Sequence, residues 1–151
     1  MRGCAQAHTH QHITAAPALS ELGAEIAVAK AKNAAGLSIA DVRYAAVYDS
    51  FTITLAMLLE DLGLAGRGEA AARVRAGHFG RDGAMPLNTH GGLLSYGHCG
   101  VGGAMAHLVE THLQMTGRAG PRQVRDASIA LLHGDGGVLS SHVSMFLERV
   151  R

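Results

Sequence analysis

The sequence is poor in the features that mark secreted and membrane proteins. It has two cysteines, Cys4 and Cys99, and no apolar run that reaches the roughly 18 residues of a membrane helix. Its start, MRGCAQAHTH, lacks the charged and then apolar layout of a signal peptide. The two cysteines could pair in principle, but intracellular thiols are kept reduced, so we expect both to be free. These absences predict a soluble, cytoplasmic protein that binds no membrane.

An excess of charge of one sign is also missing. Lys and Arg number 13 against 12 for Asp and Glu, and the charges are scattered along the chain. Without a basic patch, nucleic acid is a poor candidate for a partner. The length of 151 residues, 48% of them apolar, is that of one ordinary domain, which we expect to span residues 1–151.

Large aromatic side chains are rare, and small residues take their place. Trp is absent, there are three Phe and three Tyr, and Gly numbers 20. A core built from Ala, Leu, Val and Met lets helices and strands approach closely, as they do in layered α/β folds. The glycines gather at 63–68, 91–103 and 134–137, where we expect turns.

Apolar spacing and turn residues predict alternating helices and strands in the first part of the chain. A first helix is expected around the spaced residues Leu19, Leu22, Ile26 and Ala29, after Pro17 and before Gly36. The segment 43–47 (RYAAV) is typical of a buried strand, and 51–62 of a helix that Asp49 or Ser50 could cap. A shorter helix is expected over 69–76 and a loop over 78–87.

The last part of the chain predicts one more helix and two strands. The helix starts near Gly100, ends at Gly117 and carries a stripe formed by Met105, Leu108, Val109, His112, Leu113 and Thr116. Strands over 127–133 and 138–148 flank the turn GDGG. The apolar face of the second strand is expected to be formed by Leu139, Val143, Met145 and Leu147. These elements predict the α/β class, with a mixed sheet covered by helices and a terminal antiparallel strand pair.

Reactive side chains gather at two junctions where a strand leads into a helix. Ligands of α/β sheets bind at the carboxyl ends of strands, so these junctions are the candidate sites. The first, YDSF at 48–51, carries a phenol, a carboxylate and a hydroxyl. The same groups could equally be structural, with Asp49 and Ser50 capping the next helix and Tyr48 packing against its neighbours.

The second junction is the run NTHGGLLSYGH at 88–98. His98 precedes the expected helix, whose positive end favours a neutral imidazole that can donate to a carbonyl oxygen as it becomes an enolate. Gly91 and Gly92 permit a positive φ or a close approach to a ligand, and Asn88 and His90 add polar groups. The alternative is a structural loop in which the histidine only contacts backbone.

The remaining histidines offer a weaker candidate for a metal site. His8, His10 and His12 alternate as strand residues would and could share one face, but no cysteine or carboxylate completes a set of ligands. His107 and His112 lie in the expected last helix, where His112 on the apolar stripe is best explained as a packed core residue. We therefore expect no metal.

Three runs together carry a resemblance to a known family: YDSF at 48–51, NTHGGLLSYGH at 88–98 and HGDGGVLSSH at 133–142. They resemble motifs of the C-terminal half of the thiolase superfamily, most of all in the sterol-carrier-protein-like thiolases and their aldolase relatives. Ala7 to His10 is similar to the AHTH-like segment near the start of that half, so the resemblance covers nearly the whole chain. It implies a thiolase-type C-terminal lobe whose N-terminal half lies outside this chain.

The resemblance implies roles for several residues. His98 takes the place of the catalytic histidine that polarises the thioester carbonyl, and YDSF matches the motif written NEAF or HDCF in relatives. Further residues of the matched runs are expected to stabilise the oxyanion or position the substrate: Asn88, His90, Gly91, Gly92, Asp49 and Gly136. The substrate would be a coenzyme A thioester (acyl-CoA), and no tightly bound cofactor is implied.

The sequence departs from the thiolase pattern in its cysteines. Gly134 stands where the CxGGG motif has its acid/base cysteine, and Ser50 stands where HDCF has one. A serine hydroxyl cannot replace a thiol, whose pKa is about 8.5. Cys99 follows the histidine where proline is usual, so its position does not fit the acid/base role. The nucleophilic cysteine of thiolases belongs to the N-terminal half.

Tyrosines offer another acid/base. Tyr48 and Tyr96 stand at the two junctions, and a phenol with a pKa near 10 can exchange a proton when it is hydrogen-bonded. The pattern resembles thiolase-like retro-aldolases, in which one tyrosine would take the β-hydroxyl proton while His98 stabilises the thioester enolate. The sequence thus predicts thiolase-like acyl transfer or retro-aldol cleavage.

Expectations about partners follow from the same resemblance. We expect a homo-oligomer or a heteromer with an N-terminal thiolase half, and related enzymes also bind a small OB-fold protein. Because much of the coenzyme A pocket comes from the other half, the isolated chain is expected to be inactive. A non-catalytic binding or regulatory lobe is therefore the alternative to an enzyme.

Overall fold

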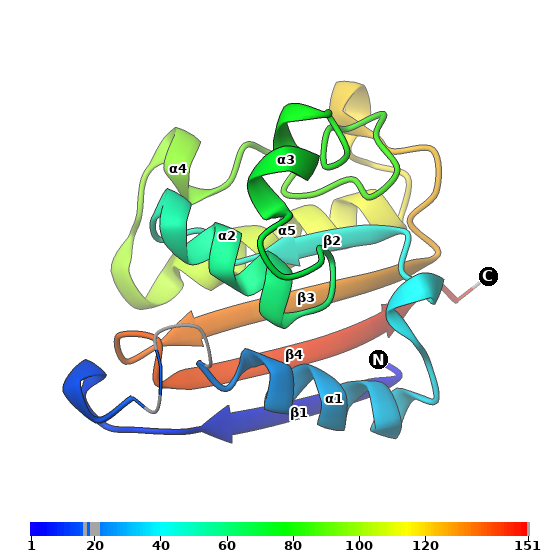
Figure 1. Cartoon of the computed structure of the whole chain (residues 1–151). Helices are drawn as coiled ribbons and strands as arrows, with labels where there is room; N and C mark the ends of the chain where they lie inside the picture. Colours follow the sequence, from blue (N-terminus) through cyan, green and yellow to red (C-terminus); the bar gives the residue numbers. More distant parts are fainter. Residues whose placement is uncertain (17, 19–21, 151) are drawn as a thin grey trace.

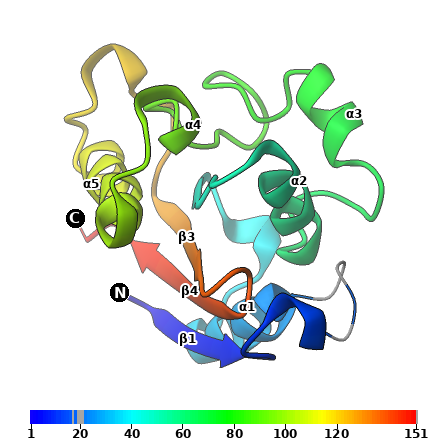
Figure 2. The same cartoon turned by 90° about the vertical axis from the view of Figure 1, so that its left-hand side faces the viewer.

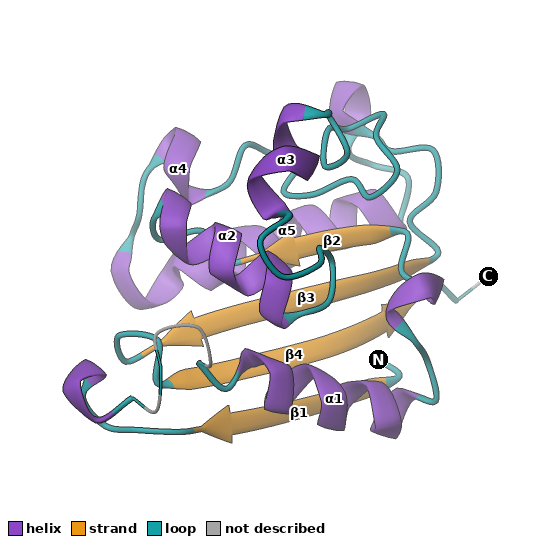
Figure 3. Ribbon diagram, viewed as in Figure 1, coloured by secondary structure: helices purple, strands orange, loops and turns teal. Residues whose placement is uncertain are grey.

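A computed structural model of the chain describes residues 1–16, 18 and 22–150, and the side chains of Tyr96 and Val101 lie outside that description. The elements are, in chain order, β1 (Gly3–His8), η1 (Ile13–Ala15), α1 (Ala24–Ala35), η2 (Ile39–Asp41), β2 (Tyr44–Val47), α2 (Thr52–Asp61), α3 (Ala70–Arg75), α4 (Leu93–Tyr96), η3 (Gly100–Gly102), α5 (Gly103–Met115), η4 (Gly120–Arg122), β3 (Ile129–Gly136) and β4 (Ser141–Glu148), as Figure 3 shows.

Four strands form one mixed sheet in the order β1-β4-β3-β2 (Figure 1). β2 runs parallel to β3, whereas β4 is antiparallel to both β3 and β1. The register of the parallel pair places Val47 beside His133, so β2 and β3 end at the same edge of the sheet. The segments that follow these two strand ends are therefore neighbours, although about 85 residues separate them in the sequence.

Helices cover both faces of this sheet (Figure 2). On one face α1 contacts β1 and β4 while α2 contacts β2, and on the other face α5 contacts β2 and β3. The core beneath α1 and α2 includes Leu131 and Phe146, whereas the core beneath α5 includes Ala130 and Leu132. The predicted α/β class, with a mixed sheet covered by helices and a terminal antiparallel pair, is confirmed.

Small side chains bring α1 close to the sheet. A Cβ on Gly3 of β1 would lie 2.5 Å from the carbonyl oxygen of Ala31, which is closer than atoms can pack. The buried residues of α1 are four alanines and one valine: Ala24, Ala27, Val28, Ala31 and Ala35. The predicted end of the helix at Gly36 is confirmed, with a φ of 65° that suits glycine.

The predicted start and face of this first helix are wrong. Leu22 is buried but precedes the helix, and Ile26 is 46% exposed because α1 turns its alanines toward the sheet. Pro17 and Leu19 lie outside the described residues.

The predicted stripe of α5 is also wrong. Met105 and Val109 are 56% and 54% exposed, and His112 is exposed as well. The buried residues of the helix are Gly103, His107, Glu110, Thr111, Gln114 and Met115. Its polar members have partners that hydrophobic periodicity cannot detect: Arg122 pairs with Glu110 at 2.9 Å, and the amide of Val124 donates to Gln114 at 2.9 Å.

The two last strands are shifted from their predicted limits. β3 continues through Gly136, so the chain turns at 137–140 and not at 134–137. The side chains buried most deeply in β4 are His142, Ser144 and Phe146, whereas the predicted apolar face is only partly buried. The two polar residues of this set are both hydrogen-bonded to His133 of β3, Ser144 at 2.8 Å and His142 at 3.2 Å.

The described helices are too short or too polar for a membrane span. Within the described part of the chain, no helix is long and apolar enough to cross a membrane.

Candidate active site

Tyr48 and His98 meet at the carboxyl edge of the sheet. Tyr48 follows the last residue of β2, is 9% exposed, and its phenol oxygen is hydrogen-bonded to Nε2 of His98. The backbone amide of Gly100 donates to Nδ1 of His98 at 3.0 Å. Nδ1 is therefore an acceptor, and the proton of a neutral imidazole lies on Nε2, from which it is donated to Tyr48. The structure thus joins the phenol of the first junction to the imidazole of the second.

The surroundings of Tyr48 keep its phenol protonated. Burial raises the pKa of Tyr48, and the negative charges of Asp135 and Asp49 raise it further. Since an unperturbed phenol already has a pKa near 10, Tyr48 is uncharged at neutral pH. It can pass a proton on only if another base accepts it.

Asp49 holds the start of α4. The backbone amides of Leu93 and Leu94 donate to its two carboxylate oxygens at 2.9 and 3.2 Å. The predicted capping of the following helix is therefore wrong: α2 has Phe51 at its N-cap and no side-chain cap. The carboxylate is turned instead toward the second junction, so Asp49 fixes the position of the segment that carries His98.

Gly92 makes this contact sterically feasible. Its φ is 69°, and a Cβ at this position would lie 2.0 Å from Oδ2 of Asp49. Gly91 also has a positive φ, of 95°, and its amide donates to the carbonyl of Asn88 at 2.8 Å. The positive φ predicted for both glycines is confirmed. The group that approaches Gly92 closely is the Asp49 carboxylate.

His107 contacts the same carboxylate, and His90 packs against His107. Nε2 of His107 lies 3.1 Å from Oδ1 of Asp49, and both side chains are almost completely buried. Burial by itself raises the pKa of Asp49, but the contacts with His107, Leu93 and Leu94 outweigh it, so the pKa is lowered overall. The ring of His90 lies edge-to-face on His107 at 4.9 Å, and burial lowers the pKa of His90. His107 was not among the predicted site residues, because the apolar spacing of α5 predicts that another face of the helix is buried.

Asn88 clamps the second junction to the end of β2. Its side-chain amide donates to the carbonyl of Val47 at 2.7 Å, and its side-chain oxygen accepts from the amide of Val47 at 2.9 Å. Asn88 is buried and has a φ of 45°, which asparagine tolerates better than most residues. In this structure the residue binds backbone and holds the two junctions together.

A cavity of about 300 Å³ opens beside Tyr48. The residues that line it come from the segment after β2, from α2, from the end of β3 and from the turn that follows β3: Tyr48, Ser50, Phe51, Thr54, Asp135, Gly136, Gly137, Val138 and Leu139. Gly136, predicted to help position the substrate, is exposed on this wall. The cavity is the space in which a substrate could reach the phenol.

Asp135 is the residue of this cavity that sequence analysis missed. Its Oδ1 is buried and has no hydrogen-bond partner among the described residues, and burial raises its pKa to about 6. Asp135 lies two residues past His133, as Asp49 lies two residues past Val47 on the paired strand. Its position just beyond the predicted end of a buried strand could have indicated a site residue. The sequence GDGG was interpreted only as a turn.

The turn that closes the cavity has an uncommon backbone. Gly137, Val138 and Leu139 have φ values of 60°, 58° and 63°, and such values are rare for a β-branched residue like Val138. Two side chains hold the turn: Ser140 donates to the carbonyl of Gly137 at 2.6 Å, and Nε2 of His142 donates to that of Leu139 at 3.0 Å. The part of the cavity wall that this turn forms is therefore held in place by Ser140 and His142.

The other candidate residues are more scattered. Tyr96 is the last residue of α4, but its side chain lies outside the described part of the structure. The predicted alternation of His8, His10 and His12 along one strand is wrong, because β1 ends at His8. Among the described residues, no group of three or more His, Cys, Asp or Glu could hold a metal ion. Cys4 and Cys99 are free and exposed.

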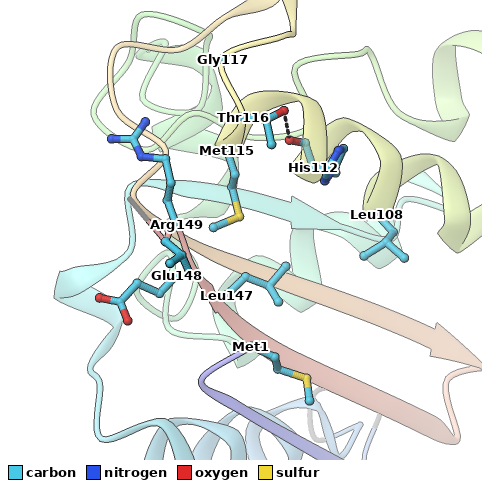
Figure 4. Close-up of a pocket in the computed structure, with 10 residues that line it drawn as sticks. Met1, Leu108, His112, Met115, Thr116, Gly117, Leu147, Glu148 and Arg149 are labelled. Carbon is cyan, nitrogen blue, oxygen red and sulfur yellow. Dashed lines mark hydrogen bonds between the residues drawn. The ribbon is translucent and has the colours of Figure 1, made fainter.

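A second hollow, of about 590 Å³, lies between the ends of α5 and β4 (Figure 4). Its walls include the apolar side chains of Leu108, Met115 and Leu147, with Glu148 and Arg149 near the end of β4. None of the predicted site residues lines it. This hollow lies on the face of the sheet that α5 covers, and its lining residues differ from those of the cavity beside Tyr48.

Comparisons with known proteins agree with this architecture. Residues 5–149 match the family model described as Thiolase C-terminal domain-like. Acetyl-CoA acetyltransferase of Methanothermobacter thermautotrophicus is 35% identical over 119 residues, which cover 75% of this chain and 31% of that protein. Sterol carrier protein 2 of Homo sapiens is 34% identical over 115 residues, covering 75% of this chain and 21% of that protein.

A solved structure is similar over almost the whole chain. The Ltp2-ChsH2(DUF35) aldolase aligns with a TM-score of 0.80 and 25% identity, covering 99% of this chain and 39% of that one. The chain spans 31% and 21% of the length of the two curated relatives.

Proposed function

The chain belongs to the thiolase C-terminal domain-like family, and we propose that it is the C-terminal lobe of an acyl-CoA enzyme that breaks a carbon–carbon bond by retro-aldol cleavage. The observation that carries this proposal is the hydrogen bond between the Tyr48 phenol and the His98 imidazole beside a cavity. The similarity in fold to an aldolase over 99% of the chain supports it.

In the proposed reaction, His98 and Tyr48 act on two different oxygens of the substrate, the thioester oxygen and the β-hydroxyl oxygen. When the substrate binds, Nε2–H of His98 changes partner from the Tyr48 phenol to the thioester oxygen, and Tyr48 exchanges a proton with the β-hydroxyl. As that proton leaves, the bond between the α and β carbons breaks and its electron pair forms the thioester enolate. Preorganised donors at such an oxyanion are worth about 10²–10³ in rate. A proton then returns to the α carbon, releasing a carbonyl compound and a shorter acyl-CoA.

The cysteines separate this reaction from thiolase-like acyl transfer. Gly134 lies in β3 at the position of the acid/base thiol, and Ser50 lines the cavity with a hydroxyl. Cys99 is exposed and follows His98 directly. A retro-aldol cleavage needs no acyl-enzyme, so the set of side chains around the cavity suits it better than a thiolysis that needs two thiols.

We also propose that the lobe acts in an assembly. The matched segment covers 31% of a whole relative, and further parts of the coenzyme A site would come from an N-terminal thiolase half, a second copy or a small OB-fold protein. Exposed Met105 and Val109 on α5 and the apolar hollow of Figure 4 offer surface for such contacts.

The test is a cleavage assay on the native assembly. The tagged chain is isolated from its source with whatever it binds, and β-hydroxyacyl-CoA substrates are followed by mass spectrometry. Tyr48→Phe is expected to lower turnover by about 10²–10⁴-fold, because it removes the proton-exchanging group. Tyr44→Phe removes the hydroxyl of a buried tyrosine at the start of β2, is the matched control and should leave turnover within about twofold.

Other outcomes would contradict the proposal. Near-normal turnover in both Tyr48→Phe and Tyr96→Phe would end the aldolase assignment. Cleavage of 3-oxoacyl-CoA that depends on added coenzyme A, without cleavage of the β-hydroxy substrate, would identify thiolase-like acyl transfer instead.

A further inference from the structure

The cavity beside Tyr48 holds one carboxylate that the proposed reaction has not yet used. Asp135 stands at the end of β3, on the cavity wall, and one of its oxygens is buried with no hydrogen-bond partner among the described residues. A buried polar atom without a partner costs free energy, so it calls for an explanation. Asp49, its counterpart at the end of β2, has both oxygens hydrogen-bonded to backbone amides.

Tyr48 alone cannot complete the proton transfer. Its phenol is protonated at neutral pH, because burial and the nearby negative charges disfavour the phenolate. The phenol can therefore accept the proton of a β-hydroxyl only while it gives its own proton to a base. His98 donates its Nε2 proton in the described geometry and has its other nitrogen occupied by the amide of Gly100, so it is not that base.

We propose, on the basis of the retro-aldol function, that Asp135 is the base that takes up this proton across the cavity it shares with Tyr48. The β-hydroxyl O–H bond breaks and its proton moves to the phenol oxygen of Tyr48, while the phenol proton moves to the carboxylate of Asp135. The α–β carbon bond breaks and its electron pair forms the enolate that His98 stabilises.

The reverse transfer closes the cycle. Asp135 returns its proton through Tyr48 to the α carbon, so the enolate becomes the product acyl-CoA and the carboxylate is regenerated. No oxidant, reductant or further reactant is needed. Asp135 would thus perform the task of the thiol that Gly134 removes from the neighbouring position.

The charged and titratable groups around Asp135 are compatible with this task. Tyr48 faces the cavity from the end of β2, whereas the carboxylate of Asp49 is turned toward the amides of α4. His133 lies two residues earlier in β3, and His142 is the paired residue of β4. Burial keeps both His133 and His142 neutral, since it lowers the pKa of each. A carboxyl with a pKa of about 6 is ionised at neutral pH and close enough to it to return the proton efficiently.

The experiment compares two reactions in the native assembly. One is cleavage of β-hydroxyacyl-CoA, and the other is exchange of the α hydrogens of the product acyl-CoA with solvent in D₂O, followed by mass spectrometry. Asp135→Asn keeps the shape but cannot accept a proton, so both rates are expected to fall by at least about 100-fold. Asp135→Glu should recover part of each rate, and Asp82→Asn, an exposed aspartate, should change neither.

The pH profile separates proton transfer from a structural role. The rate of the wild-type protein is expected to rise as the pH passes about 6, where Asp135 ionises, and the residual rate of Asp135→Asn should lack that rise. If the wild type cleaves and exchanges but Asp135→Asn retains both rates, the assignment of Asp135 is overturned and the retro-aldol function stands.

The remaining outcomes are equally decisive. If the wild type exchanges α hydrogens without cleaving, the retro-aldol function fails, and loss of exchange in Asp135→Asn still supports the role of Asp135 as base. If the wild type does neither, both the function and the role of Asp135 are overturned.

Discussion

Asp49 and Asp135 occupy equivalent places on two paired strands, yet their surroundings shift their pKa values in opposite directions. Each lies two residues past a member of the Val47 and His133 pair. Asp49 accepts two backbone hydrogen bonds and contacts His107, and its pKa is lowered. Asp135 is half-buried beside a cavity, its buried Oδ1 has no hydrogen-bond partner among the described residues, and its pKa is raised to about 6. Groups whose environments separate their pKa values in this way take different roles: one is held as a permanent charge and the other can exchange protons.

The largest loss of stability is expected from a substitution at Gly92, which lies against the carboxylate of Asp49. Gly92→Ala would place a Cβ 2.0 Å from Oδ2 of Asp49 at a φ of 69°. The clash displaces Asp49 or α4, so we expect a loss of about 4 kcal/mol or more in the free energy of unfolding, measured by urea denaturation.

Gly97→Ala is the matched control for that substitution. Gly97 also has a positive φ, of 99°, but a Cβ there meets nothing within 4 Å. With a ψ of 161° its backbone conformation is also one that is almost confined to glycine, so the substitution should cost only the roughly 1–3 kcal/mol of that conformation. Equal losses in the two variants would show that the contact between Gly92 and Asp49 is unimportant.

A smaller loss is expected from Asp49→Asn. The amide group cannot accept from both Leu93 and Leu94, so one buried backbone amide loses its partner, at a cost of about 2–3 kcal/mol at pH 7. Because the folded-state pKa of Asp49 lies below its ordinary value of 3.8, the wild-type advantage is full above that pH and is lost as the pH falls further. Urea denaturation at pH 7 and pH 3 measures it.

Asp126→Asn provides the comparison for Asp49. Asp126 also accepts from a backbone amide, that of Ser128 at 2.8 Å, but it does so at the surface. Its substitution should cost below about 1 kcal/mol. A loss as large as that of Asp49→Asn would argue against a special role for the buried carboxylate.

The substitution of Asp135 is expected to change stability in the opposite direction. The pKa of Asp135 is about 6 in the folded protein against an ordinary 3.8, so the folded state loses stability as the pH rises between those values. Asp135→Asn cannot ionise and is expected to be more stable than the wild type by roughly 2 kcal/mol at pH 8, after allowance for partial solvent screening. At pH 3.5 the difference should vanish. A variant that is no more stable at pH 8 would contradict the burial of this charge.

Local pattern was sufficient for much of the fold. The strand at 43–47, the helices at 51–62 and 69–76 and the glycine at the end of α1 agree with the structure to within a residue or two. These elements are marked by runs of apolar residues and by glycines whose effect is local. The faces of α1 and α5 were not predictable in this way, because the small Ala31 and the polar Glu110 are buried where periodicity expects larger apolar residues.

The residues of the candidate site were also predicted only in part. Tyr48, Asp49, Gly92 and His98 were identified from the sequence, and the positive φ of Gly92 with them. The partners of these residues were not. His107 and Asp135 were missed because their roles depend on which strand ends and helix faces lie side by side.

The sequence by itself determined which side chains could react and which elements carry them, since residue chemistry and turn-forming glycines are local properties. The tertiary structure decided which carboxylate is satisfied and which is left to exchange protons. That choice depends on burial and hydrogen-bond partners, which come together only when β2 and β3 pair and the segments after them meet at one edge of the sheet.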